Sequence, residues 1–66
     1  MKVIVNGKSM EIAVTMNLRD FVLSHKLEPD KIIVEFNEKV IKQPLWPETV
    51  LTDGDRIELV SLVGGG

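Results

Sequence analysis

The sequence predicts an α+β domain, in which one helix packs on one face of a mixed sheet of four to five strands. Three observations point to this class. A strand–turn–strand pattern opens the chain, and a single capped amphipathic helix follows. The later apolar segments are short and rich in β-branched residues, as strands are. A hairpin, then a helix, then further strands is the order expected of an α+β fold.

Residues 3–14 have the pattern of a β-hairpin. Asn6-Gly7 is a strong signal for a two-residue turn, because both positions of a type I′ turn need a positive φ. Period-two alternation then assigns the apolar side chains of each strand to one shared face. These side chains are Val3 and Val5 on the first strand, and Met10, Ile12 and Val14 on the return strand.

A helix is predicted over residues 18–26. Asn17 can serve as its N-cap, with Asp20 three residues later in a capping-box arrangement. Met16 before the cap and Phe21 at the fourth helical position fit a hydrophobic staple. Helical spacing marks a buried stripe, and Pro29 prevents the helix from continuing. The residues of the stripe are Leu18, Phe21 and Val22.

The second half of the chain predicts three strands. Residues 32–36 form one strand, and Asn37-Glu38 turns the chain into a short strand over 39–41. Residues 43–49 contain two prolines and cannot form a central strand, so we expect a connection that tucks Leu45 or Trp46 against the core. Asp53-Gly54-Asp55 reads as a turn, and residues 56–63 as the last strand. The first and last strands could pair in parallel at the sheet centre, which is the β-grasp arrangement of ubiquitin-like domains.

Composition excludes several classes of function. A net charge of −2 does not provide the basic face that nucleic-acid binding requires. No apolar run is long enough for a membrane-spanning helix, and the N-terminus has no signal-peptide pattern. The chain has no cysteine, so it has no thiol nucleophile and no thiolate metal site. We therefore expect a cytoplasmic protein without nucleic-acid or membrane partners.

The body of the domain shows no catalytic constellation and no metal site. His25 could act as an acid or base, but it lacks a partner in a recognisable motif and sits where it can cap the helix C-terminus. Asp53 and Asp55 lie in a loop too short for a calcium site. Trp46, between two prolines, is expected to anchor the core or cover it. We therefore expect a protein that is not itself an enzyme.

The sequence ends in Gly64-Gly65-Gly66. We expect a domain over residues 1–63 and a flexible glycine tail over 64–66, which reaches about 10 Å when extended. Such a tail could be a frayed end or a cloning remnant, or a thin rod that enters another protein. The Gly66 carboxylate would be ionised at neutral pH and a poor electrophile. Its activation, usually as an acyl-adenylate, would need another protein, because this chain has no phosphate-binding loop.

Together these features resemble the ThiS-type sulfur carrier proteins of thiamine biosynthesis. The resemblance covers essentially the whole chain. It rests on residues 3–7, on residues 33–41 followed by Trp46, on residues 53–59, and on the terminal glycines. The family usually needs only two glycines at the end, so Gly65 and Gly66 match its motif and Gly64 lengthens the rod.

The resemblance implies a β-grasp fold and a set of partners. A ThiF-type enzyme would adenylate Gly66 with ATP and magnesium, and this chain would bind no cofactor of its own. Sulfur from a persulfide, supplied through a cysteine desulfurase, would give a thiocarboxylate for a ThiG-type thiazole synthase. Gly64 and Gly65 would enter the partner's active site. Glu58, Val60 and Leu62, on the outward face of the last strand, are a candidate docking patch.

Three alternatives remain open. The small subunit of molybdopterin synthase uses the same fold and thiocarboxylate but is typically longer. A ubiquitin-like modifier would join Gly66 to a lysine of a target protein. A plain interaction module would carry an inert tail.

Overall fold

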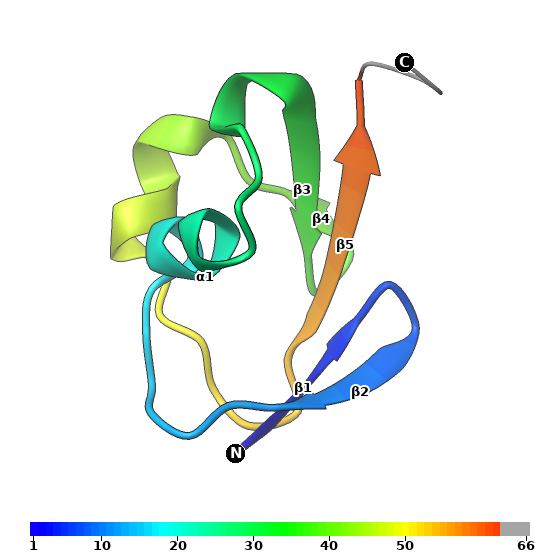
Figure 1. Cartoon of the computed structure of the whole chain (residues 1–66), viewed down its shortest axis with the longest axis vertical. Helices are drawn as coiled ribbons and strands as arrows, with labels where there is room; N and C mark the ends of the chain where they lie inside the picture. The colour runs from blue at the N-terminus through cyan, green and yellow to red at the C-terminus, as the bar shows by residue number, and fades with distance from the viewer. Residues whose placement is uncertain (63–66) are drawn as a thin grey trace.

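The computed structural model describes residues 1–62 and contains one mixed five-stranded sheet with the strand order β2-β1-β5-β3-β4. The α-helix packs against one face of this sheet (Figure 1). The strands are β1 (Lys2–Val5), β2 (Lys8–Glu11), β3 (Ile32–Phe36), β4 (Lys39–Val40) and β5 (Arg56–Ser61). The helices are α1 (Leu18–Ser24) and two 3₁₀ segments, η1 (Pro29–Lys31) and η2 (Gln43–Glu48).

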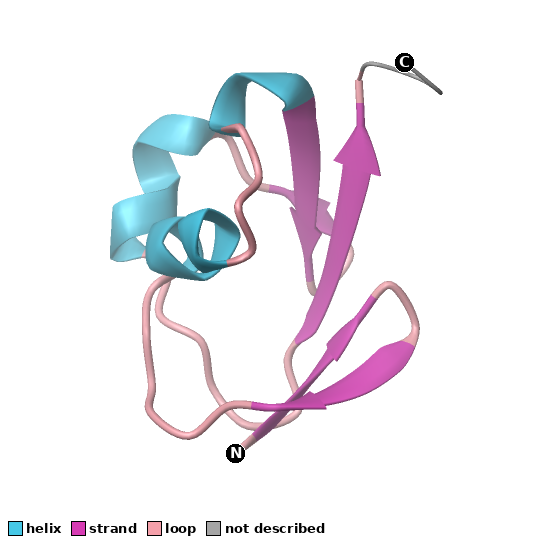
Figure 2. Cartoon of the chain, in the orientation of Figure 1, coloured by secondary structure: helices cyan, strands magenta, loops and turns pink. Residues whose placement is uncertain are grey.

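The first and last strands meet at the centre of the sheet (Figure 2). They run parallel, with Ile4 opposite Arg56 and Val5 opposite Ile57. Every other pair of neighbouring strands is antiparallel. This confirms the predicted α+β architecture and the predicted pairing of the two end strands.

The opening hairpin has the predicted turn, with φ of 50° at Asn6 and 82° at Gly7. Its return strand is shorter than expected, because β2 ends at Glu11, opposite Lys2 at the start of β1. Ile12 still exchanges hydrogen bonds with Met1, and the chain then turns toward the helix. Val14 is therefore off the sheet and 67% exposed, so its predicted place in the return strand, on one face with Met10 and Ile12, is wrong.

Helix α1 begins as predicted and ends earlier. The side-chain oxygen of Asn17 accepts a hydrogen bond of 2.7 Å from the Asp20 N–H, which satisfies one of the free donors of the first turn. The helix ends at Ser24 rather than at residue 26, because Lys26 adopts a left-handed conformation with φ of 58°. The predicted stripe is confirmed, since Leu18, Phe21 and Val22 are all buried.

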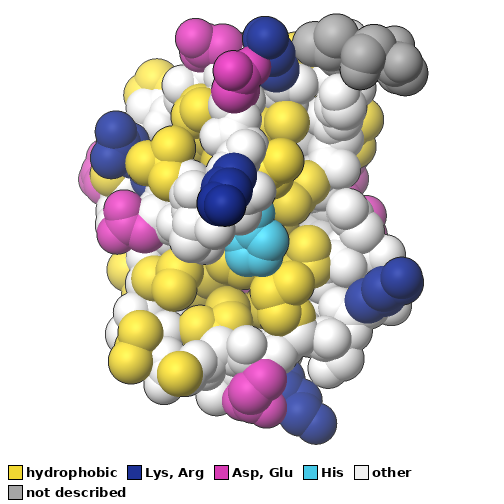
Figure 3. Space-filling model, in the orientation of Figure 1, with side chains coloured by type: hydrophobic (Ala, Val, Ile, Leu, Met, Phe, Trp, Pro, Cys, Tyr) yellow, Lys and Arg dark blue, Asp and Glu magenta, His cyan; other side chains and the backbone are white. Residues whose placement is uncertain are grey.

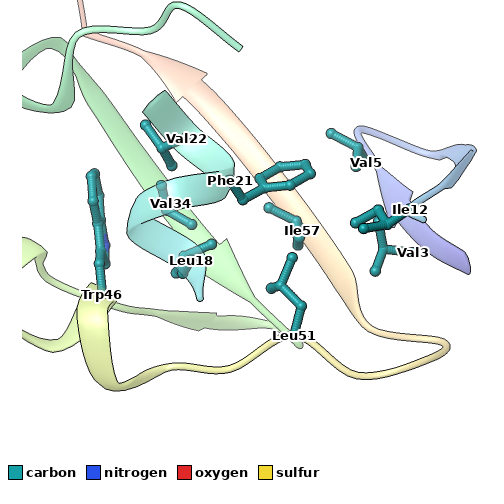
Figure 4. Packing of buried hydrophobic residues seen from close by; sticks show 10 residues of the cluster. All are labelled: Val3, Val5, Ile12, Leu18, Phe21, Val22, Val34, Trp46, Leu51 and Ile57. Carbon is teal, nitrogen blue, oxygen red and sulfur yellow. The ribbon is translucent and has the colours of Figure 1, made fainter. Parts of the chain in front are cut away.

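The core lies between α1 and the sheet and is closed at one side by η2 (Figure 4). Most of the proline-containing segment over 43–49, expected as a connection that tucks Leu45 or Trp46 against the core, forms this 3₁₀ helix. It buries Trp46 and leaves Leu45 53% exposed. The Trp46 indole N–H donates to the Ile41 carbonyl at 2.7 Å. The buried hydrophobic side chains are Val3, Val5, Ile12, Leu18, Phe21, Val22, Val34, Trp46, Leu51 and Ile57.

Strands β4 and β5 are both shorter than predicted. β4 contains Lys39–Val40, and Ile41 instead donates its N–H to the Val34 carbonyl as the chain leaves the strand. β5 ends at Ser61, and Leu62 follows it as a bend. Val63 and the predicted tail over 64–66 lie outside the described residues, so the division into a 1–63 domain and a tail stays a prediction. Within residues 1–62, no helix is long and apolar enough to cross a membrane.

Candidate functional site

Strand β5 leads to the glycine end of the chain and has a neighbour on each side. Ile57 is fully buried and Leu59 packs against the core. Alternation along a strand turns the intervening side chains to the opposite face. Glu58 and Val60 lie on that open face, Val60 47% exposed, and Leu62 just beyond the strand is 57% exposed. The structure thus gives the predicted docking patch the expected exposure, while its role in docking stays a prediction.

Two asparagines in separate turns hold β5 in place. Asn6 and Asn37 both have a φ of 50°, which asparagine tolerates better than most residues. The Asn6 side-chain oxygen accepts from the Leu59 N–H at 2.8 Å. The Asn37 side-chain oxygen accepts from the Arg56 N–H at 2.9 Å. The sequence indicated two turns here, but no local signal showed that both side chains would bond to the same distant strand.

The Asp53-Gly54-Asp55 segment is a turn, as predicted, and its carboxylates bind backbone and side-chain donors. Asp55 is buried, and its oxygens accept from the Thr52 N–H, the Thr52 hydroxyl and the Asn37 amide group. Asp53 accepts from the Lys2 N–H at 2.7 Å. Asp53 therefore ties this turn to β1, and Asp55 ties it to the turn between β3 and β4. Among residues 1–62, no group of three or more His, Asp or Glu side chains is placed to hold a metal ion.

His25 lies at the surface at the end of α1 (Figure 3). Its Nδ1 is 2.9 Å from the Phe21 carbonyl oxygen, and since a carbonyl only accepts, the imidazole N–H is the donor. The imidazole ring also packs on the Phe21 ring, with centroids 4.4 Å apart. The interpretation of His25 as a capping or surface residue is confirmed.

The residue that follows β5 is hydrogen-bonded to η1. The Leu62 N–H donates to the Lys31 carbonyl at 2.8 Å. The Lys31 ammonium is 2.8 Å from the Glu28 carboxylate. The hydrogen bond that the Lys31 ammonium donates to Glu28, together with the negative charge of Glu28, raises the pKa of Lys31 above its usual value. The last described residue is thus anchored at its backbone, while its side chain is exposed. The remaining predicted site residues, Gly64, Gly65 and Gly66, lie outside the described part of the chain.

The sequence of this chain is similar to those of several known proteins. A sequence model of the ThiS family matches residues 3–66. The chain is 39% identical over 62 residues to the sulfur carrier protein ThiS of Bacillus subtilis, covering 92% of this chain and 94% of that protein. It is also 26% identical over 66 residues to a thiazole synthase of Paramagnetospirillum magneticum. That match covers all of this chain but only 20% of the synthase, so the chain spans about a fifth of that relative.

The fold has a solved counterpart. The crystal structure of a thiamine biosynthesis protein (ThiS) from Geobacter metallireducens matches with a TM-score of 0.87 at 28% identity, and the match covers 100% of both chains. The mixed five-stranded sheet with one α-helix is therefore the β-grasp fold that the sequence predicted. By its sequence over residues 3–66 and by its fold, the chain belongs to the ThiS family.

Proposed function

We propose that this chain is a sulfur carrier of thiamine biosynthesis and that it carries sulfur on the terminal carboxylate of Gly66. The observation that carries the proposal is the family match, which extends through the glycines to residue 66. The sulfur carrier from Bacillus subtilis, 39% identical to this chain, supports the same role.

The chemistry follows from the properties of a carboxylate. A ThiF-type partner would use ATP and magnesium, and a Gly66 oxygen would attack the α-phosphorus as pyrophosphate leaves. The terminal sulfur of a persulfide, supplied through a cysteine desulfurase, would then attack the acyl carbon of the adenylate and displace AMP. A thiol would cleave the resulting S–S bond, forming a disulfide and leaving the thiocarboxylate. Each of these steps breaks or makes bonds at the terminus, so the domain itself needs no acid or base.

In this proposal the domain is the platform that partners recognise. Residues 63–66 span at most about 13–14 Å when extended, so a partner's active site must lie close to Leu62. Glu58, Val60 and Leu62 are exposed beside that point and would form part of the docking surface. Brief contacts through a small interface suit a carrier that must leave one enzyme for the next.

A thiazole synthase is the proposed acceptor of the sulfur. Two thiazole synthases contain a stretch that matches all of this chain, at 26% and 30% identity. A carrier-like stretch within the length of a synthase supports a functional link between the two. We further propose that these partners meet the carrier in the cytoplasm.

Intact-mass spectrometry tests the proposal directly. The chain would be incubated with a ThiF-type enzyme, ATP, magnesium, cysteine and a cysteine desulfurase. The expected product is heavier by the difference between sulfur and oxygen. An unchanged mass would overturn the carrier role, and recovery of a branched lysine peptide from cells would indicate a modifier instead. Copurification with molybdopterin synthase rather than thiazole synthase would assign the carrier to the other pathway.

A further inference from the structure

The open face of the sheet continues from β5 onto β3 and β4. Ile33 lies opposite Val60 in the β3–β5 register, and Val40 lies opposite Glu35 in the β3–β4 register. Directly paired residues share a face, so Ile33, Val40 and Val60 all lie on the open side. They are 37%, 58% and 47% exposed. The exposed apolar surface beside Leu62 is therefore three strands wide.

Two carboxylates lie within this surface. Glu35 on β3 lies directly opposite Glu58 on β5. On the open face, this pair is next to the pair formed by Ile33 and Val60. Like charges in directly opposite positions destabilise a sheet. The ion pairs of residues 1–62 are Met1 with Glu11 and Lys31 with Glu28, so neither member of the Glu35–Glu58 pair has a cation of this chain within ion-pair distance.

A hollow of about 340 Å³ adjoins the same surface at the edge of the sheet where β4 ends. Ile33, Val40 and Leu62 line it from the open face, and Ile41 and Trp46 line it from the core side. Its charged lining residues are Asp30 and Lys42. The hollow is therefore continuous with the apolar part of the open face and lies next to the exit of β5.

We propose that this face docks a partner surface that presents a lysine or arginine beside an apolar side chain. The cation would lie between Glu35 and Glu58, and the apolar group would enter the hollow beside Leu62. Charge complementarity identifies the partner's chemistry, because a cation placed beside two neighbouring carboxylates would interact favourably with both. The inference rests on the proposed function, in which the first partner to dock is the adenylating enzyme.

The test is ATP–pyrophosphate exchange by a purified ThiF-type enzyme from the same source, with the chain as the varied substrate. The double variant Glu35→Gln and Glu58→Gln should raise KM about tenfold at low salt and leave kcat unchanged, because charge complementarity acts mainly on encounter and docking. The KM of the unaltered chain should rise with salt, and that of the double variant should change little. Ile33→Ser should also raise KM.

Matched controls separate local from general effects. Glu48→Gln removes one exposed carboxylate from η2, and Val14→Ser changes a more exposed apolar residue outside the face; both should leave KM unchanged. The unfolding midpoint of the double variant should equal or exceed that of the parent, since like charges in directly opposite positions destabilise a sheet. Equal KM values for parent and variants at every salt concentration, or an equal rise with Glu48→Gln, would overturn the inference. Failure of the unaltered chain to support exchange would instead overturn the proposed function.

Discussion

Asn6 and Asn37 show how much a single side chain contributes in a domain of this size. Each stands at a turn position with a φ of 50°, a conformation that few residues other than glycine adopt readily. Each side-chain oxygen also accepts a hydrogen bond from a backbone N–H of β5. The turn residue and the strand it supports are therefore energetically linked, although they are far apart in the sequence.

Variants of Asn6 test this link. Asn6→Gly keeps the positive φ but removes the bond to Leu59, and it should lower the free energy of unfolding by about 1 kcal/mol. Asn6→Ala should cost about 1 kcal/mol more, because alanine is strained in the left-handed region. Asn6→Asp retains an acceptor and tolerates the conformation, so it should be the least affected. Urea denaturation measures all three, and equal losses for Asp and Gly would show that the bond contributes nothing.

Leu62 is the residue nearest to the proposed reaction that the structure describes, and it is 57% exposed. Leu62→Asp should raise the KM of the chain in ATP–pyrophosphate exchange about tenfold or more, as truncation of a central interface residue does. Val14→Asp introduces the same charge at a 67% exposed position away from the open face and should have no effect. Unaltered exchange kinetics for Leu62→Asp would exclude Leu62 from the docking surface.

At the scale of elements, the Asp53–Asp55 turn connects three parts of the fold. Asp55 accepts from Thr52 beside it and from Asn37 in the β3–β4 turn, and Asp53 accepts from Lys2 in β1. These hydrogen bonds position the first residue of β5 relative to β1 and β3. The turn therefore determines which side chains of β5 face the core.

Removal of the Asp55 carboxylate should destabilise the whole sheet. Asp55→Ala would leave the part-buried donors of Thr52 and Asn37 without an acceptor, at a cost of about 1–3 kcal/mol. Asp55→Asn retains one acceptor oxygen and should cost less. Thermal unfolding of the two variants gives the comparison, and a smaller loss for Ala than for Asn would contradict this account.

The sequence predicted the elements that local patterns determine. The Asn6-Gly7 turn, the Asn17 cap and the strand over 32–36 all follow from residues adjacent in the chain. The residues at which β2 and α1 end could not be predicted from adjacent residues. The end of β2 depends on the length of its partner strand, and the end of α1 on a left-handed conformation at Lys26.

The sequence also predicted only part of the candidate site. Alternation along one strand was enough to assign Glu58, Val60 and Leu62 to the outward face. Ile33 and Val40 complete that face, but only the register between strands reveals it. The glycine end was visible in the sequence alone, and its chemistry was inferred from the family resemblance rather than from geometry.

At the scale of the whole molecule, the core and the proposed reacting end are separate. Within residues 1–62, the ten buried hydrophobic residues lie between Val3 and Ile57. A protein that presents its terminus to successive enzymes can therefore alter that terminus without altering its fold.

Deletion of Gly65 and Gly66 tests this separation. The free energy of unfolding should change by less than about 0.5 kcal/mol, as for changes away from packed features. Exchange with the adenylating enzyme and thiocarboxylate formation should both be lost. The unaltered chain in the same assays is the control. Retention of thiamine synthesis by cells that carry only the truncated chain would contradict the carrier role.

The parallel pairing of β1 and β5 has a mechanical consequence. β1 begins at the lower end of the sheet in Figure 1, and β5 finishes at the upper end. Tension applied between Lys2 and Leu62 acts along both strands, so it loads their shared hydrogen bonds together in shear. An antiparallel pair pulled from one end would open one bond at a time. Force transmitted between the two ends of this pair is thus shared among its hydrogen bonds.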